Sequence, residues 1–156
     1  LELIEVGEII KSASFTAAAV LPDGRILVAT DCSQLAIIDA HQAATTVTYT
    51  RPATPTLPVH FRAVTATTAS TLFLTGDDRG HVCWWDVRDA TMPVRTIDLP
   101  DGIAIAGMTT FGDSVHVCDC RGNIYGIDVA DGWVTELHRS NFTFSGATCM
   151  TVLSGD

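Results

Sequence analysis

The sequence is poor in lysine and in the polar residues that favour helices. Of its 156 residues, one is lysine and four are glutamate. Thr and Val are plentiful instead, which favours strands. The net charge is −9, and the eight arginines are scattered along the chain. A nucleic-acid binder usually carries a basic stripe, and an anionic membrane surface attracts basic clusters. We therefore expect no direct nucleic-acid binding, and the acidic balance mainly favours solubility.

Long apolar runs and secretory features are also missing. No apolar run of 18 residues occurs, so no membrane span is predicted, and no signal segment opens the chain. The five cysteines have no framework spacing, which favours reduced thiols in an intracellular compartment, cytoplasmic or nuclear. Because the chain does not begin with Met and stops inside a repeated pattern, we expect it to be part of something longer.

Motifs of catalysis and metal binding are absent from the sequence. Its five histidines are isolated, and none forms a zinc-type pair. Cys118 and Cys120 could place two thiolates together, but a structural zinc needs four ligands, so buried structural cysteines are favoured. There is no nucleophile elbow, phosphate-binding loop or paired-carboxylate signature. We predict a protein that is not an enzyme and that holds no metal or cofactor.

What the sequence does contain is an internal repeat. Asp39, Asp86 and Asp128 each end an apolar run, and their spacings are 47 and 42 residues. This is close to the period of about 40–45 residues of a four-stranded propeller blade. A small turn residue recurs six positions before each Asp, as Ser33, Gly80 and Gly122.

Each repeat unit predicts four strands. First strands open at Phe15, at Phe61 and near 103–105, and final strands cover 45–50, 93–99 and 133–138. We predict an all-β fold, a β-propeller of about three and a third four-stranded antiparallel blades. The predicted single domain, 1–156, comprises a final strand of a preceding blade (1–12), three blades (13–50, 60–99 and 103–139) and the start of a further blade (143–156).

A partial ring of this kind needs completion. Natural propellers have about four to eight blades, and two open apolar blade faces are an aggregation hazard. We expect the remaining blades to come from the rest of the chain or from a partner.

The stretch "DDRGHVCWWDV", from Asp77 to Val87, resembles the third-strand signature of WD-repeat propellers, and "CRGNIYGIDV" and "CSQLAIIDA" resemble degenerate copies. A strand covered on both faces reads as one apolar run, so Trp84 is expected to face one neighbouring blade and Trp85 the other. The family's Gly-His dipeptide is absent, with His60 the only candidate histidine. Of the family's buried Asp–His–Ser–Trp network, at best Asp78 and Trp85 remain.

The resemblance implies a non-catalytic scaffold, a subunit of an intracellular multiprotein complex whose partners are other proteins. "DCRGNIYGIDVADGWV" also resembles a quinoprotein-type repeat, so a propeller enzyme or cofactor protein stays open. A split propeller completed by a partner chain is the other alternative.

Recognition in a propeller is expected at one rim, on the turns between second and third strands and on the links between blades. Arg79 and Arg121 hold matching positions there and could grip a carboxylate. The candidate partner-binding residues are Asp77, Arg79, His81, Arg121, Asn123, Arg51 and His60.

Overall fold

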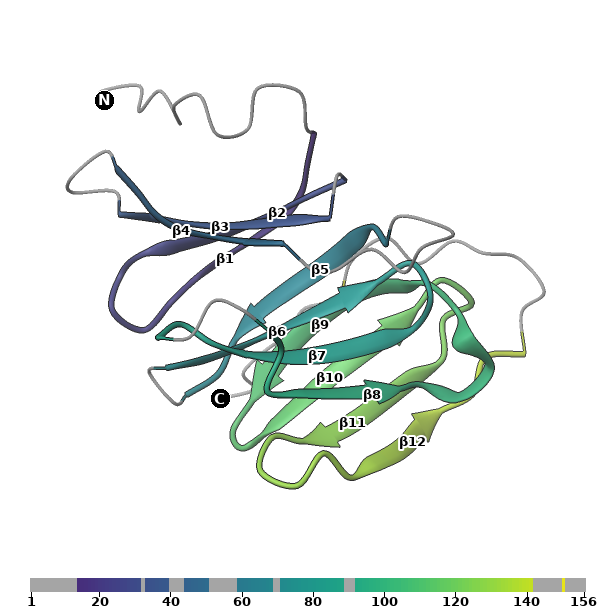
Figure 1. Cartoon of the computed structure of the whole chain (residues 1–156). Coiled ribbons are helices and arrows are strands. Elements are labelled where there is room, and N and C mark those ends of the chain that lie inside the picture. Colours follow the sequence, from purple (N-terminus) through teal and green to yellow (C-terminus); the bar gives the residue numbers. More distant parts are fainter. Residues whose placement is uncertain are drawn as a thin grey trace.

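The computed structural model describes residues 14–31, 33–39, 44–50 (backbone only), 59–68, 71–88, 92–141 and 150. Its strands form three four-stranded antiparallel sheets, each with the strands in chain order. Figure 1 shows the sheets placed one after another like blades. The predicted all-β fold, a partial β-propeller, is confirmed. Within the described part, no helix has the length and apolarity needed to cross a membrane.

The three sheets are called blades 1, 2 and 3. Blade 1 comprises β1 (Phe15–Val20), β2 (Ile26–Thr30), β3 (Gln34–Asp39) and β4 (Ala44–Thr50). Blade 2 comprises β5 (Phe61–Ala66), β6 (Leu72–Asp77), β7 (His81–Asp86) and β8 (Arg95–Asp98). Blade 3 comprises β9 (Ile105–Phe111), β10 (Ser114–Asp119), β11 (Ile124–Asp128) and β12 (Val134–His138). The Asp repeat thus marks the last residue of the third strand in every blade.

The small residue that precedes each Asp by six positions has a backbone reason. Ser33, Gly80 and Gly122 have φ angles of 62°, 79° and 85°. This left-handed region is costly for most residues with a Cβ and open to glycine. The turn between the second and third strands therefore selects Gly in two blades and tolerates Ser in the third.

The cores lie between the blades. Between blades 1 and 2, Leu27 and Ile37 pack in one buried cluster with Phe61, Phe73 and Trp85. The Trp85 ring stacks on Phe73, with an interplanar angle of 8°, and meets Phe61 edge-on at 78°. Blade 1 thus meets blade 2 through an aliphatic surface set against aromatic rings.

The core between blades 2 and 3 is built from a second cluster. Leu74 and Trp84 of blade 2 pack there with Val115, Tyr125 and Ile127 of blade 3. Trp84 is 2% exposed and Trp85 0%. The adjacent tryptophans therefore face opposite ways and anchor blade 2 to both of its neighbours.

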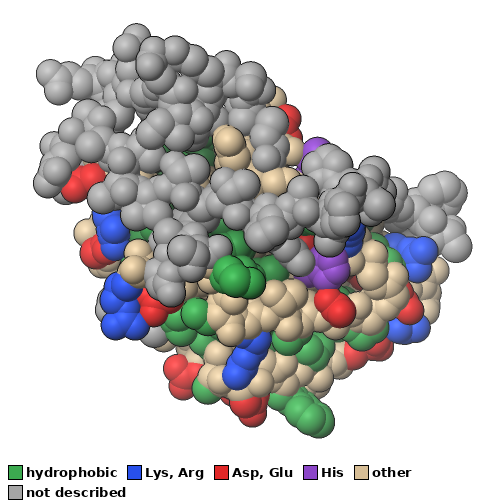
Figure 2. Space-filling view, in the orientation of Figure 1, with side chains coloured by type: hydrophobic (Ala, Val, Ile, Leu, Met, Phe, Trp, Pro, Cys, Tyr) green, Lys and Arg blue, Asp and Glu red, His purple; other side chains and the backbone are tan. Residues whose placement is uncertain are grey.

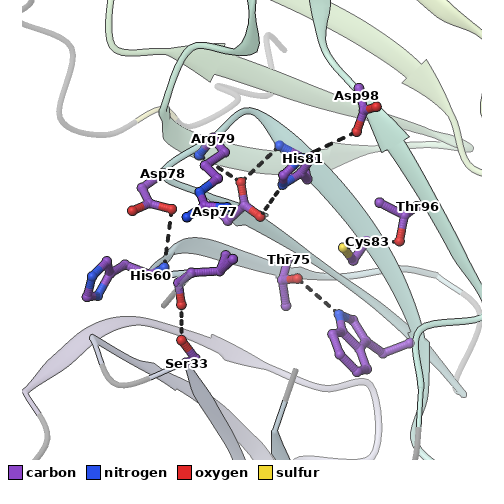
Figure 3. A network of polar contacts seen from close by, with 12 residues as sticks. Ser33, His60, Thr75, Asp77, Asp78, Arg79, His81, Cys83, Thr96 and Asp98 are labelled. Atoms are coloured by element: carbon purple, nitrogen blue, oxygen red, sulfur yellow. Dashed lines mark hydrogen bonds and ion pairs between the residues drawn. The ribbon is translucent and has the colours of Figure 1, made fainter. Parts of the chain in front are cut away.

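Two separate hydrogen bonds stand where the WD-repeat resemblance implies one connected polar network. The indole Nε1 of Trp85 donates a 3.0 Å hydrogen bond to Thr75 Oγ1, and the backbone N of His60 donates a 3.2 Å bond to Asp78 Oδ1. The His60 ring contacts the Asp31 carbonyl oxygen instead of joining these two bonds. The expectation that only Asp78 and Trp85 remain is thus corrected, because Thr75 supplies a hydroxyl partner for Trp85 (Figure 3).

Candidate partner-binding rim

One rim of the propeller carries the turns between second and third strands and the described link 99–104 between blades 2 and 3. The same backbone hydrogen bond recurs on this rim in all three described blades. A backbone N of the turn donates to the carbonyl oxygen of the residue that directly precedes the first strand. The donors and acceptors are Asp31 N to Ser14 O (3.0 Å), Asp78 N to His60 O (3.0 Å) and Cys120 N to Ala104 O (2.8 Å). The rim is therefore held by backbone contacts that place its side chains reproducibly.

Asp77 shapes the rim turn of blade 2. Its side chain is 1% exposed, and Oδ1 accepts hydrogen bonds of 2.9 Å from the backbone N of both Arg79 and His81. Its Oδ2 lies 2.7 Å from His81 Nδ1. One carboxylate thus fixes the turn backbone and the orientation of the imidazole.

Asp119 does the same in blade 3. Its Oδ1 accepts bonds from the backbone N of Arg121 (2.8 Å) and Asn123 (3.0 Å), and its Oδ2 accepts a 2.7 Å bond from Asn123 Nδ2. Asn123 Oδ1 in turn accepts a bond from Ser140 N at 3.0 Å. The pair Asp119–Asn123 is therefore the structural counterpart of Asp77–His81.

Two residues of the predicted binding set, Asp77 and Asn123, are buried, at 1% and 5% exposure, and their side chains bond within their turns. In this structure they support the rim turns, and their part in partner binding stays a prediction. Arg51 lies outside the described residues.

Arg79, His81, Arg121 and His60 stay accessible. Arg121 is exposed, and the other three are half-buried. Figure 3 shows Arg79 and His81 beside Asp77 in the rim turn of blade 2. Arg79 and His81 lie at the rim turn of blade 2, and Arg121 lies at the rim turn of blade 3. The rim therefore carries guanidinium and imidazole groups on two adjacent blades.

Asp98 belongs to the same surface, and the sequence reasoning missed it. It stands opposite His81 in the β7–β8 pairing, and its Oδ1 lies 3.6 Å from His81 Nε2. The Asp98 side chain is 80% exposed, against 25% for His81. The β7–β8 register, which pairs His81 with Asp98, was the signal that could have predicted this contact. Where Figure 2 shows described side chains, acidic and basic groups are interspersed.

No metal centre is found among the described side chains: no group of three or more His, Cys, Asp or Glu could hold an ion. Cys118 is buried, and burial, with Asp119 and Cys120 nearby, raises the pKa of its thiol. The pairing of β10 with β9 shifts register after Cys118, and Cys120 lies beyond the end of the strand. The two sulfurs therefore do not share one regular strand face.

The arrangement of blades is shared with solved propellers. The chain is similar to the structure titled "Crystal structure of RRP9 WD40 repeats", with a TM-score of 0.70 and 15% identity over 83% of this chain and 39% of that one. A chain of the "Mitotic Checkpoint Complex" structure gives a TM-score of 0.70 at 13% identity, over 86% of this chain and 41% of that one. "Kuenenia stuttgartiensis Hydrazine Synthase" gives 0.66 at 15% identity, over 83% and 38%.

These likenesses show the fold: the three blades are arranged as in solved β-propellers, WD40-repeat structures among them. No family model and no curated protein matches the sequence. The chain spans 39% of the length of the first of these structures.

Proposed function

We propose that this chain forms part of a WD-repeat propeller that acts as a protein-interaction scaffold in an intracellular complex, without catalysis of its own. Further blades, from the same protein, complete the ring. The partner docks on the rim built by the turns of blades 2 and 3. Its contact surface includes a carboxylate-bearing segment that pairs with Arg79 and Arg121.

The proposal rests on one arrangement that both rim turns share: a buried Asp bonds the turn backbone, and an Arg lies two residues further on. Asp77 and Asp119 accept hydrogen bonds from the turn backbone, while Arg121 in the same kind of turn is exposed and Arg79 is half-buried. Guanidinium groups on rigid supports form strong paired hydrogen bonds with carboxylates. A preordered rim also binds with a smaller entropic cost than a flexible loop.

Affinity purification of the intact protein, with and without Arg79→Glu and Arg121→Glu, tests this function. The double charge reversal is expected to remove at least one partner that the unchanged protein retains. The matched control reverses Arg25 and Arg88, which lie in turns at the opposite rim and pair with Asp23 and Asp86. Retention of every partner by the Arg79/Arg121 variant, with both variants equally folded, would reject the rim as the docking site.

A further inference from the structure

The first strand of each blade carries the same irregularity near its start. The pairing of β1 with β2 skips Thr16, that of β5 with β6 skips Arg62, and that of β9 with β10 skips Ala106. Each skipped residue is the second of its strand. A β-bulge of this kind leaves one residue outside the ladder and changes the direction of its side chain. Every described blade therefore holds one such residue at the same level.

The three bulges lie at the rim end of the first strands. The residue before each bulge pairs with the last residue of the second strand: Phe15 with Thr30, Phe61 with Asp77 and Ile105 with Asp119. The rim turns begin directly after these partners. The bulges therefore share a rim with Arg79 and Arg121.

The bulges also share one hollow of about 230 Å³. Thr16, Arg62 and Ala106 all line it, and its other described walls come from β1, β5 and β9, except for Met150. The strand β5 packs against both β1 and β9, so the first strands are the inner edges of the blades. Because propeller blades surround a central channel, this hollow is part of the channel, at its rim mouth.

Arg62 brings a charge into this hollow. It is the one charged residue among the described residues that line it. Its side chain is exposed, and no hydrogen bond or ion pair joins its guanidinium to another described residue. By contrast, Arg25 and Arg88 bond carboxylates, and Arg95 bonds a carbonyl oxygen. The N–H donors of Arg62 are therefore open to an acceptor from outside the described segment.

The other walls of the hollow indicate what kind of acceptor fits. They are mostly small or apolar, among them Ala18, Ala63, Gly107 and Met108. A single guanidinium beside apolar walls matches the carboxylate and the methylene groups of an acidic side chain. A phosphate carries more charge and is usually held by a cluster of arginines. The described lining thus favours a carboxylate.

We propose that the channel mouth binds an acidic side chain of a partner protein, whose carboxylate pairs with the Arg62 guanidinium while its methylene groups pack on the alanines of the hollow. The inference rests on the proposed function in one respect, that the ligand is a protein segment docked on this rim. Arg62 is then an anchor at the centre of the rim, in addition to Arg79 and Arg121 on its turns.

Peptide selection on the full-length protein tests the inference. A phage-displayed library of random linear peptides is selected in parallel on the unchanged protein and on Arg62→Ala. Peptides enriched on the unchanged protein alone are expected to share an Asp or Glu. Their binding, measured by fluorescence anisotropy, should weaken about 10- to 100-fold in Arg62→Ala, because a charge-assisted hydrogen bond is lost.

Two further variants act as controls. Arg62→Lys should lose less than Arg62→Ala, since it keeps the charge but not the planar fork. Arg25→Ala removes a guanidinium from the opposite rim and should leave peptide binding unchanged. Circular dichroism is expected to show the same fold for all three variants, because the Arg62 side chain is exposed and Arg25 pairs only with its neighbour Asp23 in a turn.

A double-mutant cycle locates the contact. In a second peptide the shared acid is replaced by its amide, Glu by Gln or Asp by Asn. If the carboxylate pairs with Arg62, this change weakens binding to the unchanged protein and adds little to the loss in Arg62→Ala. Additive losses, or selected peptides without a shared acid, would overturn the inference. So would displacement by inorganic phosphate of peptides that tolerate the amide.

The outcome is separable from that of the proposed function. The peptide measurements use purified protein and the Arg62 side chain, whereas the rim turns are tested by charge reversal at Arg79 and Arg121. Loss of partners on that reversal, together with additive losses in the peptide cycle, would keep the rim function and reject the channel-mouth site. Coupling at Arg62 with every partner retained by the Arg79/Arg121 variant would do the reverse.

Discussion

Trp84 and Val129 lie on different blades, and the indole Nε1 of Trp84 donates a 3.1 Å hydrogen bond to the Val129 carbonyl oxygen. Arg95 strengthens the same junction. Its guanidinium carbon lies 5.7 Å from the Trp84 ring centroid, and Nη1 donates a 3.0 Å bond to the Ala130 carbonyl oxygen. The turn after β11 is therefore held against blade 2 by a ring and a cation together.

Replacing Trp84 should separate blades 2 and 3. Trp84→Ala removes a ring that is 2% exposed and is expected to cost about 3–5 kcal/mol of unfolding free energy. Trp84→Phe keeps most of the ring but leaves the Val129 oxygen without its donor, at about 1–2 kcal/mol. Urea unfolding followed by circular dichroism measures both. Equal losses for the two variants would show that the hydrogen bond, and not the packed ring, holds the junction.

Gly80 and Gly24 form a matched pair for testing close approach between blades. Both have positive φ, 79° and 86°, but a Cβ at Gly80 would lie 2.8 Å from the Ile103 carbonyl oxygen, whereas Gly24 has nothing within 4 Å. Gly24→Ala should cost about 1 kcal/mol from backbone conformation alone. Gly80→Ala should cost at least about 2 kcal/mol, since backbone must also move. Chemical denaturation of both variants checks the difference, and equal costs would contradict the contact.

The buried carboxylate of Asp77 should be required for the rim turn of blade 2. Asp77→Ala removes the acceptor of the Arg79 and His81 backbone N–H groups, and leaving such donors without a partner costs about 1–3 kcal/mol each. Amide hydrogen exchange should speed up at Arg79 and His81 and stay unchanged at Arg121 and Asn123, which depend on Asp119. Faster exchange in both turns would indicate global loosening instead.

Acid should weaken the turn that follows β7. The Arg88 guanidinium lowers the pKa of Asp86 from 3.8 to about 2, mainly through side-chain hydrogen bonds. Since the folded pKa lies below the unfolded value, the stabilising contribution is present above about pH 4 and is lost as pH falls toward 2. Carboxyl NMR titration should place Asp86 near 2 and return it toward 3.8 in Arg88→Ala. A titration unaffected by that substitution would mean that Arg88 is not the cause.

The repeat made most of the fold predictable. Three Asp residues and the small turn residue before each sufficed to place the middle strands, because a propeller blade repeats the same turn with the same backbone angles. The strand after Pro93 was expected to cover 93–99 but begins at Arg95. Outer strands carry a weak pattern, since only one of their faces packs on a core.

The rim was harder to predict than the blades. Asp77 and Asn123 are charged or polar residues in a turn, which on sequence alone favours solvent exposure. Their burial depends on backbone N–H groups that the turn aims inward, and these are visible only in three dimensions. Thr75 and Asp98 were missed for a related reason, because cross-strand neighbours lie many residues apart in sequence.

The bond that ties each rim turn to the start of its blade joins one backbone to another, and the acceptors are the carbonyls of Ser14, His60 and Ala104. These three side chains share no chemistry. Because this hydrogen bond uses no side-chain atom, substitutions at those positions can accumulate over evolutionary time without breaking it. Substitutions at such positions lower sequence identity without changing the fold. The RRP9 WD40-repeat structure, at 15% identity and a TM-score of 0.70 to this chain, is in keeping with this.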